Sequence, residues 1–320
     1  MQPISALILL AFPLAALCHP SARRDEVFQS RATFTLKDHY QGKDFLDWDF
    51  FSNADPTHGN VNYLTKSEAI AKGLAYVQKD GTTVLAVDDT SRGVKNRDSV
   101  RISSPKAYTT GLFIADIWAM PHGPTTWPAY WTVGPNWPHN GEIDLLEGVG
   151  ESETNQITLH TGAGCTLDTG FAAKFSGKAT GTKNCQSGNG GNAGCGIRET
   201  TPNAYGHKFN MIAGGVTAHL VDASGIKVWR FPRTDIPADI TAQKPDPSTW
   251  GKPAALFSSS TCDIKEHFKD HVLTFDTTLC GDLAGNLFPG GPAACEKEVG
   301  NPDNFKLAKW MINYVAVYDS

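Results

Sequence analysis

Three acidic residues, Glu142, Asp144 and Glu147, lie within one short segment in which aliphatic residues separate them. On a β-strand the side chains alternate between two faces, so Glu142 and Asp144 point the same way and Glu147 would point the opposite way. A β-bulge within Leu145–Leu146 would add one residue and return Glu147 to the face of the other two, and bulges are common beside active sites. The segment therefore predicts three carboxylates on one face of a strand.

Two glutamates brought together in this way could perform acid–base and nucleophilic chemistry. With the bulge, Glu142 and Glu147 are separated by roughly 13 Å between Cα atoms, at ~3.3 Å per residue. If their side chains lean together, the carboxyl groups could approach the ~5–5.5 Å that a retaining glycosidase requires. Asp144 lies between them, where it could hydrogen-bond one partner and separate the two pKa values. The alternatives are a solvated, charged sheet edge and a calcium site.

Aromatic residues are concentrated just upstream of these acids. They are Trp118, Trp127, Tyr130, Trp131 and Trp137. Pyranose rings stack on aromatic rings, so such a run is typical of a sugar-binding surface. The alternative for each single tryptophan is a place in the hydrophobic core.

Short segments of strand character recur between turn signals along most of the chain. They include Ser99–Ser103, Leu112–Trp118, Glu142–Leu146, Gln156–His160, Gly215–Val221, Ile226–Phe231 and Lys309–Val317. Helical periodicity is weak apart from Lys66–Lys72 and Asp263–His271. An all-β antiparallel sandwich is the simplest arrangement of these elements. The segment 181–196, rich in Gly, Asn and Cys, predicts a surface loop held by a disulfide.

Composition excludes some classes of function. The chain of 320 residues is 40% hydrophobic and 19% charged, as expected of a globular protein with a sizeable core. Its net charge of -5 argues against nucleic acid as a partner. Ile4–Leu17 is a short apolar stretch typical of a secretory signal, so we expect residues 1–18 to be a signal peptide. A short propeptide could extend to Arg24, and residues 25–320 would form a single domain of a secreted protein. No later segment is long and apolar enough to span a membrane, so we expect no membrane partner.

The cysteine count agrees with export. Of seven cysteines, six remain if Cys18 leaves with the signal, which allows up to three disulfides in 15 possible pairings. No two cysteines have the spacing of a zinc ligand pair. His267 and His271 after Glu266 could form half of a zinc site, but a helix turn on the surface explains them more simply. We therefore expect no metal and no cofactor.

Two motifs resemble glycoside hydrolase family 16, in its fungal laminarinase-like branch. They are Trp127–Trp131 and Gly141–Gly148, of which the second has the longer, bulged form of the family motif E-x-D-x-(x)-E. Five further segments resemble the family in the same order. These are Asp55–Val61, Asp98–Ile102, Thr158–Thr161, Cys280–Asp282 and Trp310–Tyr318.

The resemblance implies an antiparallel β-jelly-roll sandwich, concanavalin A-like, with a concave substrate cleft. Glu142 would be the nucleophile, Glu147 the acid/base and Asp144 a supporting residue. Substrate-binding residues would be Trp127, Trp131 and His160, together with Trp137 from the aromatic run. The chain departs from the family at Leu283, where relatives often carry Trp, and at Pro124–Thr125, where they carry a turn with Gly or Cys.

The function expected on this basis is that of a secreted endo-1,3(4)-β-glucanase. It would hydrolyse β-1,3-glucan, and also β-1,3-1,4-glucan, by double displacement, as a monomer and without a cofactor. One alternative is a cell-wall glucan transglycosylase of the same fold, in which a sugar replaces water. Another is a non-catalytic β-glucan-binding protein. Such relatives typically lack one of the glutamates, whereas this chain has both.

Overall fold

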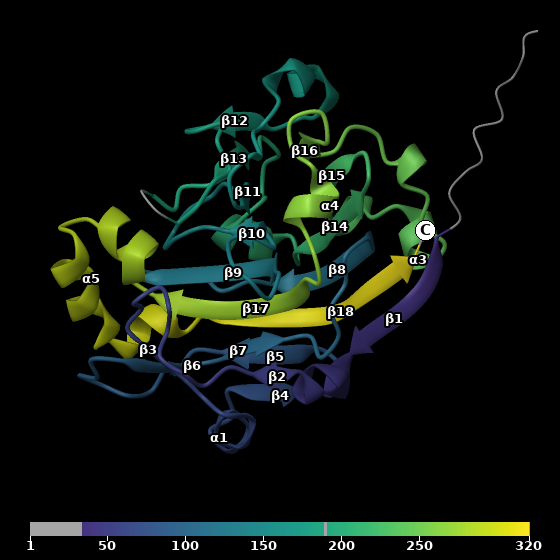
Figure 1. Ribbon diagram of the computed structural model, residues 1–320. Coiled ribbons are helices and arrows are strands. Elements are labelled where there is room, and N and C mark those ends of the chain that lie inside the picture. The colour runs from purple at the N-terminus through teal and green to yellow at the C-terminus, as the bar shows by residue number, and fades with distance from the viewer. Residues whose placement is uncertain (1–33, 189–190, 320) are drawn as a thin grey trace, which may run out of the picture. The chain divides into compact units, whose positions relative to one another are not determined.

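Two large antiparallel β-sheets dominate the computed structural model, which describes residues 34–188 and 191–319. The first sheet has the strand order β16-β15-β14-β8-β18-β5-β4, with β1 paired to β18 (Figure 1). Its strands are β1 (Thr35–Gln41), β4 (Ala75–Val77), β5 (Thr83–Ala86), β8 (Gly111–Ala119), β14 (Gly215–Asp222), β15 (Gly225–Pro232), β16 (Ala255–Ser258) and β18 (Lys309–Asp319).

The second sheet has the order β12-β13-β11-β10-β9-β17-β7-β2. Its strands are β2 (Asp49–Phe50), β7 (Arg101–Ser103), β9 (Thr126–Val133), β10 (Glu142–Glu147), β11 (Gln156–His160), β12 (Lys178–Thr180), β13 (Cys195–Arg198) and β17 (Val272–Leu279). A separate pair, β3 (Val61–Tyr63) and β6 (Arg97–Ser99), is parallel. The expected single strand Ser99–Ser103 is therefore divided between two strands. Ser99 ends β6, which pairs with β3, and after the buried Val100 the chain joins the second sheet as β7.

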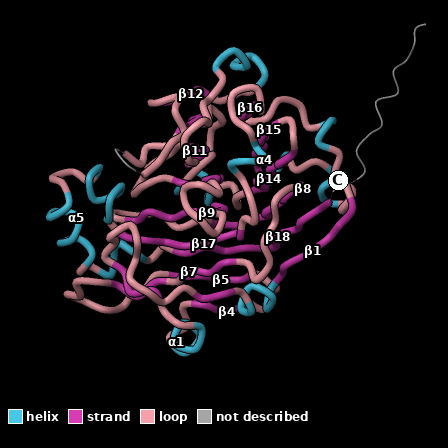
Figure 2. Tube along the Cα trace, viewed as in Figure 1, coloured by secondary structure: helices cyan, strands magenta, loops and turns pink. Residues whose placement is uncertain are grey.

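Helices are short and lie outside the sheets, as Figure 2 shows for α1 and α5. The α-helices are α1 (Lys66–Ala71), α2 (Gly206–Met211), α3 (Ala238–Thr241), α4 (Ile264–His267) and α5 (Pro292–Val299). Single turns of other helix types are η1 (Gly42–Asp47), η2 (Thr169–Lys174), η3 (Arg233–Asp235), η4 (Pro247–Thr249), η5 (Gly281–Gly285) and η6 (Pro302–Phe305). Helices expected within Lys66–Lys72 and Asp263–His271 are present, while α5 was not anticipated.

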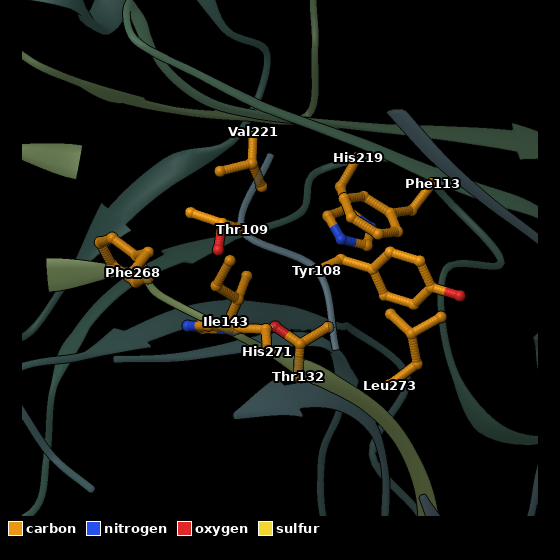
Figure 3. A pocket seen from close by; sticks show the side chains of 10 residues that line it. All are labelled: Tyr108, Thr109, Phe113, Thr132, Ile143, His219, Val221, Phe268, His271 and Leu273. Atoms are coloured by element: carbon orange, nitrogen blue, oxygen red, sulfur yellow. The ribbon is translucent and has the colours of Figure 1, made fainter. Parts of the chain in front are cut away.

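The inner faces of both sheets share one hydrophobic core. Phe275 of β17 stacks on Tyr130 of β9 at 4.5 Å between ring centroids and meets Trp310 of β18 edge-on at 5.3 Å. Figure 3 shows a small cavity in this interior, where the rings of Phe113 and His219 stack. Its volume of about 10 Å³ has room for roughly one water molecule, so this cavity is not a substrate site.

The outer face of the first sheet is covered in part by the chain itself. Trp229 and Trp250 pack there edge to face at 5.4 Å, and both are buried. Ile240 of α3 joins the same apolar cluster, so the segment between β15 and β16 covers part of this face, while Trp118 of β8 stays 44% exposed.

Three disulfides cross-link segments that lie between strands or at a strand end. The disulfides are Cys165–Cys262, Cys185–Cys195 and Cys280–Cys295, and the second lies within the segment 181–196, as expected.

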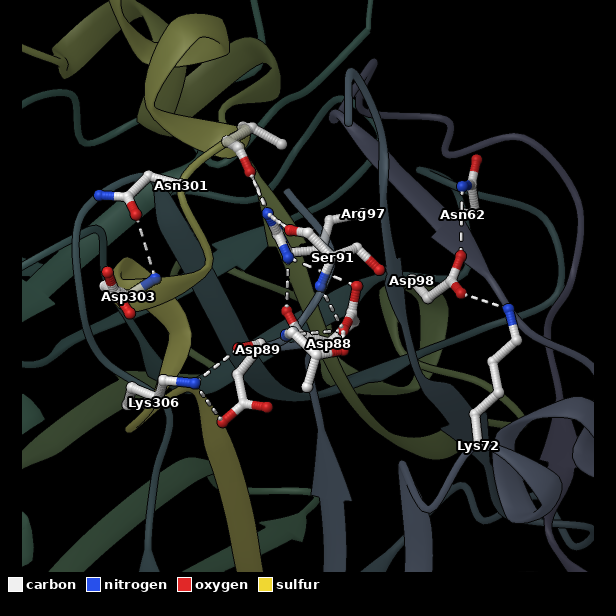
Figure 4. A network of polar contacts seen from close by, with 12 residues as sticks. Asn62, Lys72, Asp88, Asp89, Ser91, Arg97, Asp98, Asn301, Asp303 and Lys306 are labelled. Carbon is white, nitrogen blue, oxygen red and sulfur yellow. Dashed lines mark hydrogen bonds and ion pairs between the residues drawn. The ribbon is translucent and has the colours of Figure 1, made fainter. Parts of the chain in front are cut away.

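Arg97 lies beside Asp88 (Figure 4) and donates to the main-chain oxygens of Asp88 and Val299. The Arg97 side chain is fully buried, and its guanidinium also lies over the ring of Phe305. This one side chain therefore ties the loop after β5 to the C-terminal end of α5.

The described residues form one compact unit, and none of their helices is long and apolar enough to cross a membrane. The predicted signal peptide (1–18) and the propeptide to Arg24 lie outside the described residues.

Candidate active site

The predicted β-bulge is present in β10. Asp144 pairs with Trp131 of β9 and Leu146 pairs with Tyr130, so Leu145 is the extra residue. Leu145 and Leu146 are both buried in the core, and Glu147 lies opposite the outward-facing Ala129. Because the bulge restores the alternation, Glu147 reaches the outer face of the second sheet beside Glu142 and Asp144.

The strand is fixed at its start by tight packing. Gly141, immediately before Glu142, has a φ of +80°, a conformation that favours glycine. A Cβ atom at Gly141 would lie 2.4 Å from the main-chain oxygen of His267 in α4. Glu142 is then set between Val133 of β9 and His160 of β11.

Three indole N–H groups point at carboxylates on this face. Trp127 donates to Glu147 Oε1 at 2.8 Å, and Trp137 donates to Glu142 Oε2. Trp131 donates to Asp276 Oδ1 at 3.1 Å. The predicted sugar-stacking residues therefore also hold the acids, and Trp137 is the most open of the three, at 41% exposed.

His160 lies against the central acid. Its Nε2 is 3.2 Å from Asp144 Oδ2, and its Nδ1 is 2.8 Å from the hydroxyl of Ser187. Asp144 also lies close enough to Glu142 for the two carboxyl groups to share a proton in a hydrogen bond. His160 is buried, so its position supports the acids rather than forming an open contact surface.

Burial changes the protonation of all three acids. It raises the pKa of Glu142 to about 8 and that of Glu147 to about 7. Burial, and after it the charge of Glu147, raises the pKa of Asp144 well above its usual range. The indole donors and His160 act in the opposite sense, because they stabilise the charged forms of Glu142 and Glu147. The group therefore retains protons at neutral pH that exposed carboxyl groups would lose, which suits acid catalysis.

Glu142, Asp144 and His160 are also the one set among the described residues that could ligate a metal ion, with ligand atoms within 4.8 Å of one another. A cation bound there would ligate the carboxylate of Glu142, which would then not be free to act as a nucleophile. The zinc half-site considered at His267 and His271 is not formed, because the ring nitrogens of His271 are bonded to Thr132 and to the main-chain oxygen of Asn140.

A fourth acid on this face, Asp276, was missed from sequence. It accepts hydrogen bonds from Tyr63 at 2.8 Å and from Trp131, and burial raises its pKa to about 6. The guanidinium of Arg101 lies 4.8 Å from the Trp131 ring centroid, so one face of that ring is already covered. The available signal was the single acid among the threonines of Val272–Leu279, a segment that was not recognised as a strand.

Two residues of the aromatic run lie elsewhere. Tyr130 points into the core, and Trp118 belongs to β8 of the first sheet. Tyr130 is separated because neighbours in a strand alternate faces, and Trp118 because the chain passes from the first sheet to the second between β8 and β9. Thr125, at the departure from the family turn, has a φ of +72°, the conformation for which glycine is preferred.

Comparison with known proteins identifies the family. A family profile described as an XgeA-like catalytic GH16 domain matches residues 48–318. A probable glycosidase from Schizosaccharomyces pombe is 40% identical over 94% of this chain and 73% of its own length. An endo-1,3(4)-beta-glucanase from Arthroderma benhamiae is 39% identical over 90% of this chain and 65% of its own length. A probable endo-1,3(4)-beta-glucanase from Aspergillus clavatus is matched over 51% of its length, so the chain spans only part of these relatives.

Solved structures agree with this assignment. Laminarinase 16A from Phanerochaete chrysosporium, with 6-O-glucosyl-laminaritriose in its donor and acceptor sites, has a TM-score of 0.84 and 40% identity. An elongating family 16 β-1,3-glucosyltransferase has the same TM-score and identity, and each match covers 90% of this chain and 100% of the other. With a family profile and relatives of this identity covering most of its length, the chain belongs to glycoside hydrolase family 16 and has the jelly-roll fold of its laminarinases.

Proposed function

We propose that this protein is a secreted retaining endo-β-glucanase that hydrolyses β-1,3-glucan, and also β-1,3-1,4-glucan. Glu147 gives its proton to the glycosidic oxygen while Glu142 attacks the anomeric carbon, which forms a glycosyl-enzyme and releases one fragment. Glu147 then takes a proton from water, and this water attacks the anomeric carbon and frees Glu142. Each displacement inverts the anomeric centre, so the product retains its configuration.

The bulged strand is the observation that carries this proposal. It places Glu142 and Glu147 on one face with Asp144 between them. Asp144 and Glu142 are joined by a hydrogen bond, so the proton that Glu142 must lose before it attacks can pass to Asp144. Burial raises the pKa of Glu147 to about 7, so this group can carry the proton that the leaving oxygen needs. The order of the two roles rests on the family motif and not on these pKa values, because burial raises the pKa of Glu142 further, to about 8.

The substrate follows from the surface beside these acids and from the relatives. Trp127, Trp131 and Trp137 offer ring surfaces on which pyranose units can stack. Relatives of this chain include endo-1,3(4)-beta-glucanases, and Laminarinase 16A holds 6-O-glucosyl-laminaritriose. Secretion is supported by the signal-like start and by three disulfides, which persist in oxidising compartments.

Transglycosylation is the second candidate. It is favoured by the similarity to the elongating β-1,3-glucosyltransferase, which equals the similarity to Laminarinase 16A. In that reaction the hydroxyl of a second sugar replaces water in the second step. Product sizing on laminarin separates the two, because hydrolysis gives only shorter chains and transfer also gives longer ones.

Chemical rescue tests the roles of the two glutamates. In Glu147→Ala, an aryl β-glucoside substrate with an activated leaving group should still glycosylate Glu142, and azide should release a β-glycosyl azide after two inversions. In Glu142→Ala, azide should attack directly and give the α-azide after one inversion. The anomeric proton coupling measured by NMR distinguishes the products. The opposite assignment of anomers to the two variants would reverse the proposed roles.

A further inference from the structure

We propose that Asn155 is a positioning residue for the acid/base Glu147, which it holds through the backbone on both sides of the bulge. The inference rests on the function proposed above, because it assigns Glu147 the proton that the leaving group receives. It concerns a residue that is not open to substrate, since the Asn155 side chain is fully buried.

The ladder between β10 and β11 stops where the bulge begins. Its pairs are Glu142 with His160, Ile143 with Leu159 and Asp144 with Thr158, and no pair follows. Continued in the same register, this ladder would place Asn155 opposite Glu147. The bulge therefore leaves the backbone of Leu145 and Glu147 without strand partners on this side, in a buried place where an unmade hydrogen bond is costly.

The side-chain amide of Asn155 makes the missing bonds. Its Oδ1 accepts from the main-chain N–H of Glu147 at 2.8 Å, and its Nδ2 donates to the main-chain oxygen of Leu145 at 2.8 Å. Nδ2 donates its second hydrogen to Glu199 Oε1, also at 2.8 Å. The orientation of the amide is set by its two main-chain partners, because the main-chain oxygen of Leu145 can only accept and the Glu147 N–H can only donate.

A buried ion pair holds the amide in turn. Glu199 lies 3.7 Å from Nε of Arg230, which belongs to β15 of the first sheet, and both side chains are almost fully buried. Arg230 also donates to the hydroxyl of Thr217 at 2.8 Å and lies over the ring of Phe209. The chain of contacts therefore runs from the bulge in one sheet to the opposite sheet, and it restricts the rotation of Asn155.

Glu147 is thus held at two points. Asn155 fixes its main-chain N–H, and Trp127 fixes its carboxylate at 2.8 Å. Proton donation to a glycosidic oxygen depends on the position of that carboxyl group, and a displacement of about 1 Å can cost on the order of 100-fold in rate. Loss of the Asn155 clamp should therefore reduce acid catalysis more than any other step.

The test compares two substrates that differ in their need for an acid. Cleavage of laminaripentaose requires protonation of the leaving oxygen, whereas 2,4-dinitrophenyl β-laminaribioside does not. In Asn155→Leu, which keeps the approximate size and removes all three hydrogen bonds, kcat/KM for laminaripentaose should fall by on the order of 100-fold. The kcat/KM for the dinitrophenyl substrate, which reports attack by Glu142, should fall far less. Asn155→Ser is the second variant if Asn155→Leu does not fold, because water can occupy the space that the shorter side chain leaves. Its kcat/KM for laminaripentaose should again fall more than that for the dinitrophenyl substrate, but by a smaller factor.

Asn210 provides a matched control. Its side-chain amide also bonds to main-chain groups in both directions, accepting from Met120 N–H and donating to Met120 O at 2.9 Å each, but it joins α2 to the residue that follows β8 of the first sheet. Asn210→Leu should lower the melting temperature and leave the ratio of the two kcat/KM values at the wild-type level. An unchanged ratio in both Asn155 variants would overturn the inference.

The acid variant separates this failure from a failure of the proposed function. Glu147→Ala must itself shift the ratio in favour of the dinitrophenyl substrate. If Glu147→Ala shifts the ratio and the Asn155 variants do not, only the positioning role is wrong. If Glu147→Ala does not shift it, or the wild-type protein leaves laminaripentaose intact, the proposed function fails and the inference fails with it.

Discussion

The outer faces of the two sheets carry the same residue type in opposite circumstances. On the first sheet Trp229 and Trp250 donate their indole hydrogens to Gly251 O and to Asp239, and the segment between β15 and β16 buries both rings. On the second sheet Trp127 and Trp137 also donate to acceptors, but these are the carboxylates of Glu147 and Glu142 and the rings are only partly covered. Tryptophan content alone therefore does not indicate a sugar site. The proposed sugar site differs from the covered face because its tryptophan rings are partly open and lie beside carboxyl groups.

The largest effect should come from an acid on the open face. Glu142→Gln removes the proposed nucleophile and should reduce kcat on laminarin by on the order of 10⁴- to 10⁶-fold. The same change should raise the melting temperature. The pKa of Glu142 rises from the usual 4.5 to about 8 on folding, so the cost of ionising it in the folded state grows as pH rises from 4.5 and is complete above pH 8.

Melting curves of wild type and Glu142→Gln check this sign, with equal folding of the two confirmed by circular dichroism. The gain in melting temperature should be larger at pH 8 than at pH 5. A gain that shrank as the pH rose would contradict the burial of this carboxylate.

On the covered face the effect should be on stability. Trp250→Ala leaves a cavity in a packed cluster and should reduce the free energy of unfolding by about 3–5 kcal/mol. Turnover by the folded fraction should not change, because Trp250, which precedes β16, packs against the first sheet and the acids lie on the second. Denaturant unfolding, with activity normalised to the folded fraction, measures both quantities. A loss of turnover per folded molecule would contradict the prediction that the covered face contributes to stability alone.

Trp131→Ala should have the opposite effect, a loss of activity with little loss of stability. One face of its ring is covered by Arg101, so a sugar can stack only on the other, and kcat/KM should fall by an amount equivalent to about 1–3 kcal/mol. Trp131→Phe is the matched control, because it keeps a ring but cannot donate to Asp276. If stacking dominates, Phe should restore most of the activity. Equal losses in both variants would instead assign the effect to the bond with Asp276.

The smallest effect should come from the turn that leads into the open face. Thr125 adopts a left-handed conformation, which costs a residue other than glycine about 1–2 kcal/mol. Thr125→Gly should recover part of this cost, less the ~0.5–1 kcal/mol that glycine loses in chain entropy. Thr126→Gly, in β9, is the control and should destabilise. A lower melting temperature in Thr125→Gly would mean that the Thr125 side chain contributes more packing energy than the strain it carries.

The sequence was sufficient for features that depend on local alternation. The bulge in Leu145–Leu146 follows from the parity of positions between Glu142 and Glu147, and the structure confirms it. The long strand Lys309–Val317 is also present, since its apolar residues repeat with the period of a strand.

Contacts between distant segments could not be predicted in this way. Asp276 accepts a hydrogen bond from the indole N–H of Trp131, which lies 145 residues away in sequence. Neither sequence segment indicates that the other is its partner. The three disulfides are one of 15 pairings, which only the fold selects. In the sequence Asn155 is an ordinary polar residue before a strand. Its role is not visible there, because only the bulge leaves the main-chain groups of Leu145 and Glu147 without strand partners, so that they hydrogen-bond to Asn155.

The extra residue in β10 also makes the active face tolerant of a change in chain length. A one-residue deletion within a strand usually exchanges its two faces, because every later side chain changes sides. Here Leu145 has no partner in β9, so its removal would leave Leu146 opposite Tyr130 and Glu147 opposite Ala129 in regular succession. The shorter and longer forms of the motif thus encode the same arrangement of acids. A gene could pass from one form to the other by losing a single codon, at the cost of one buried leucine, and in the shorter form the amide of Asn155 would have no bulge left to hold.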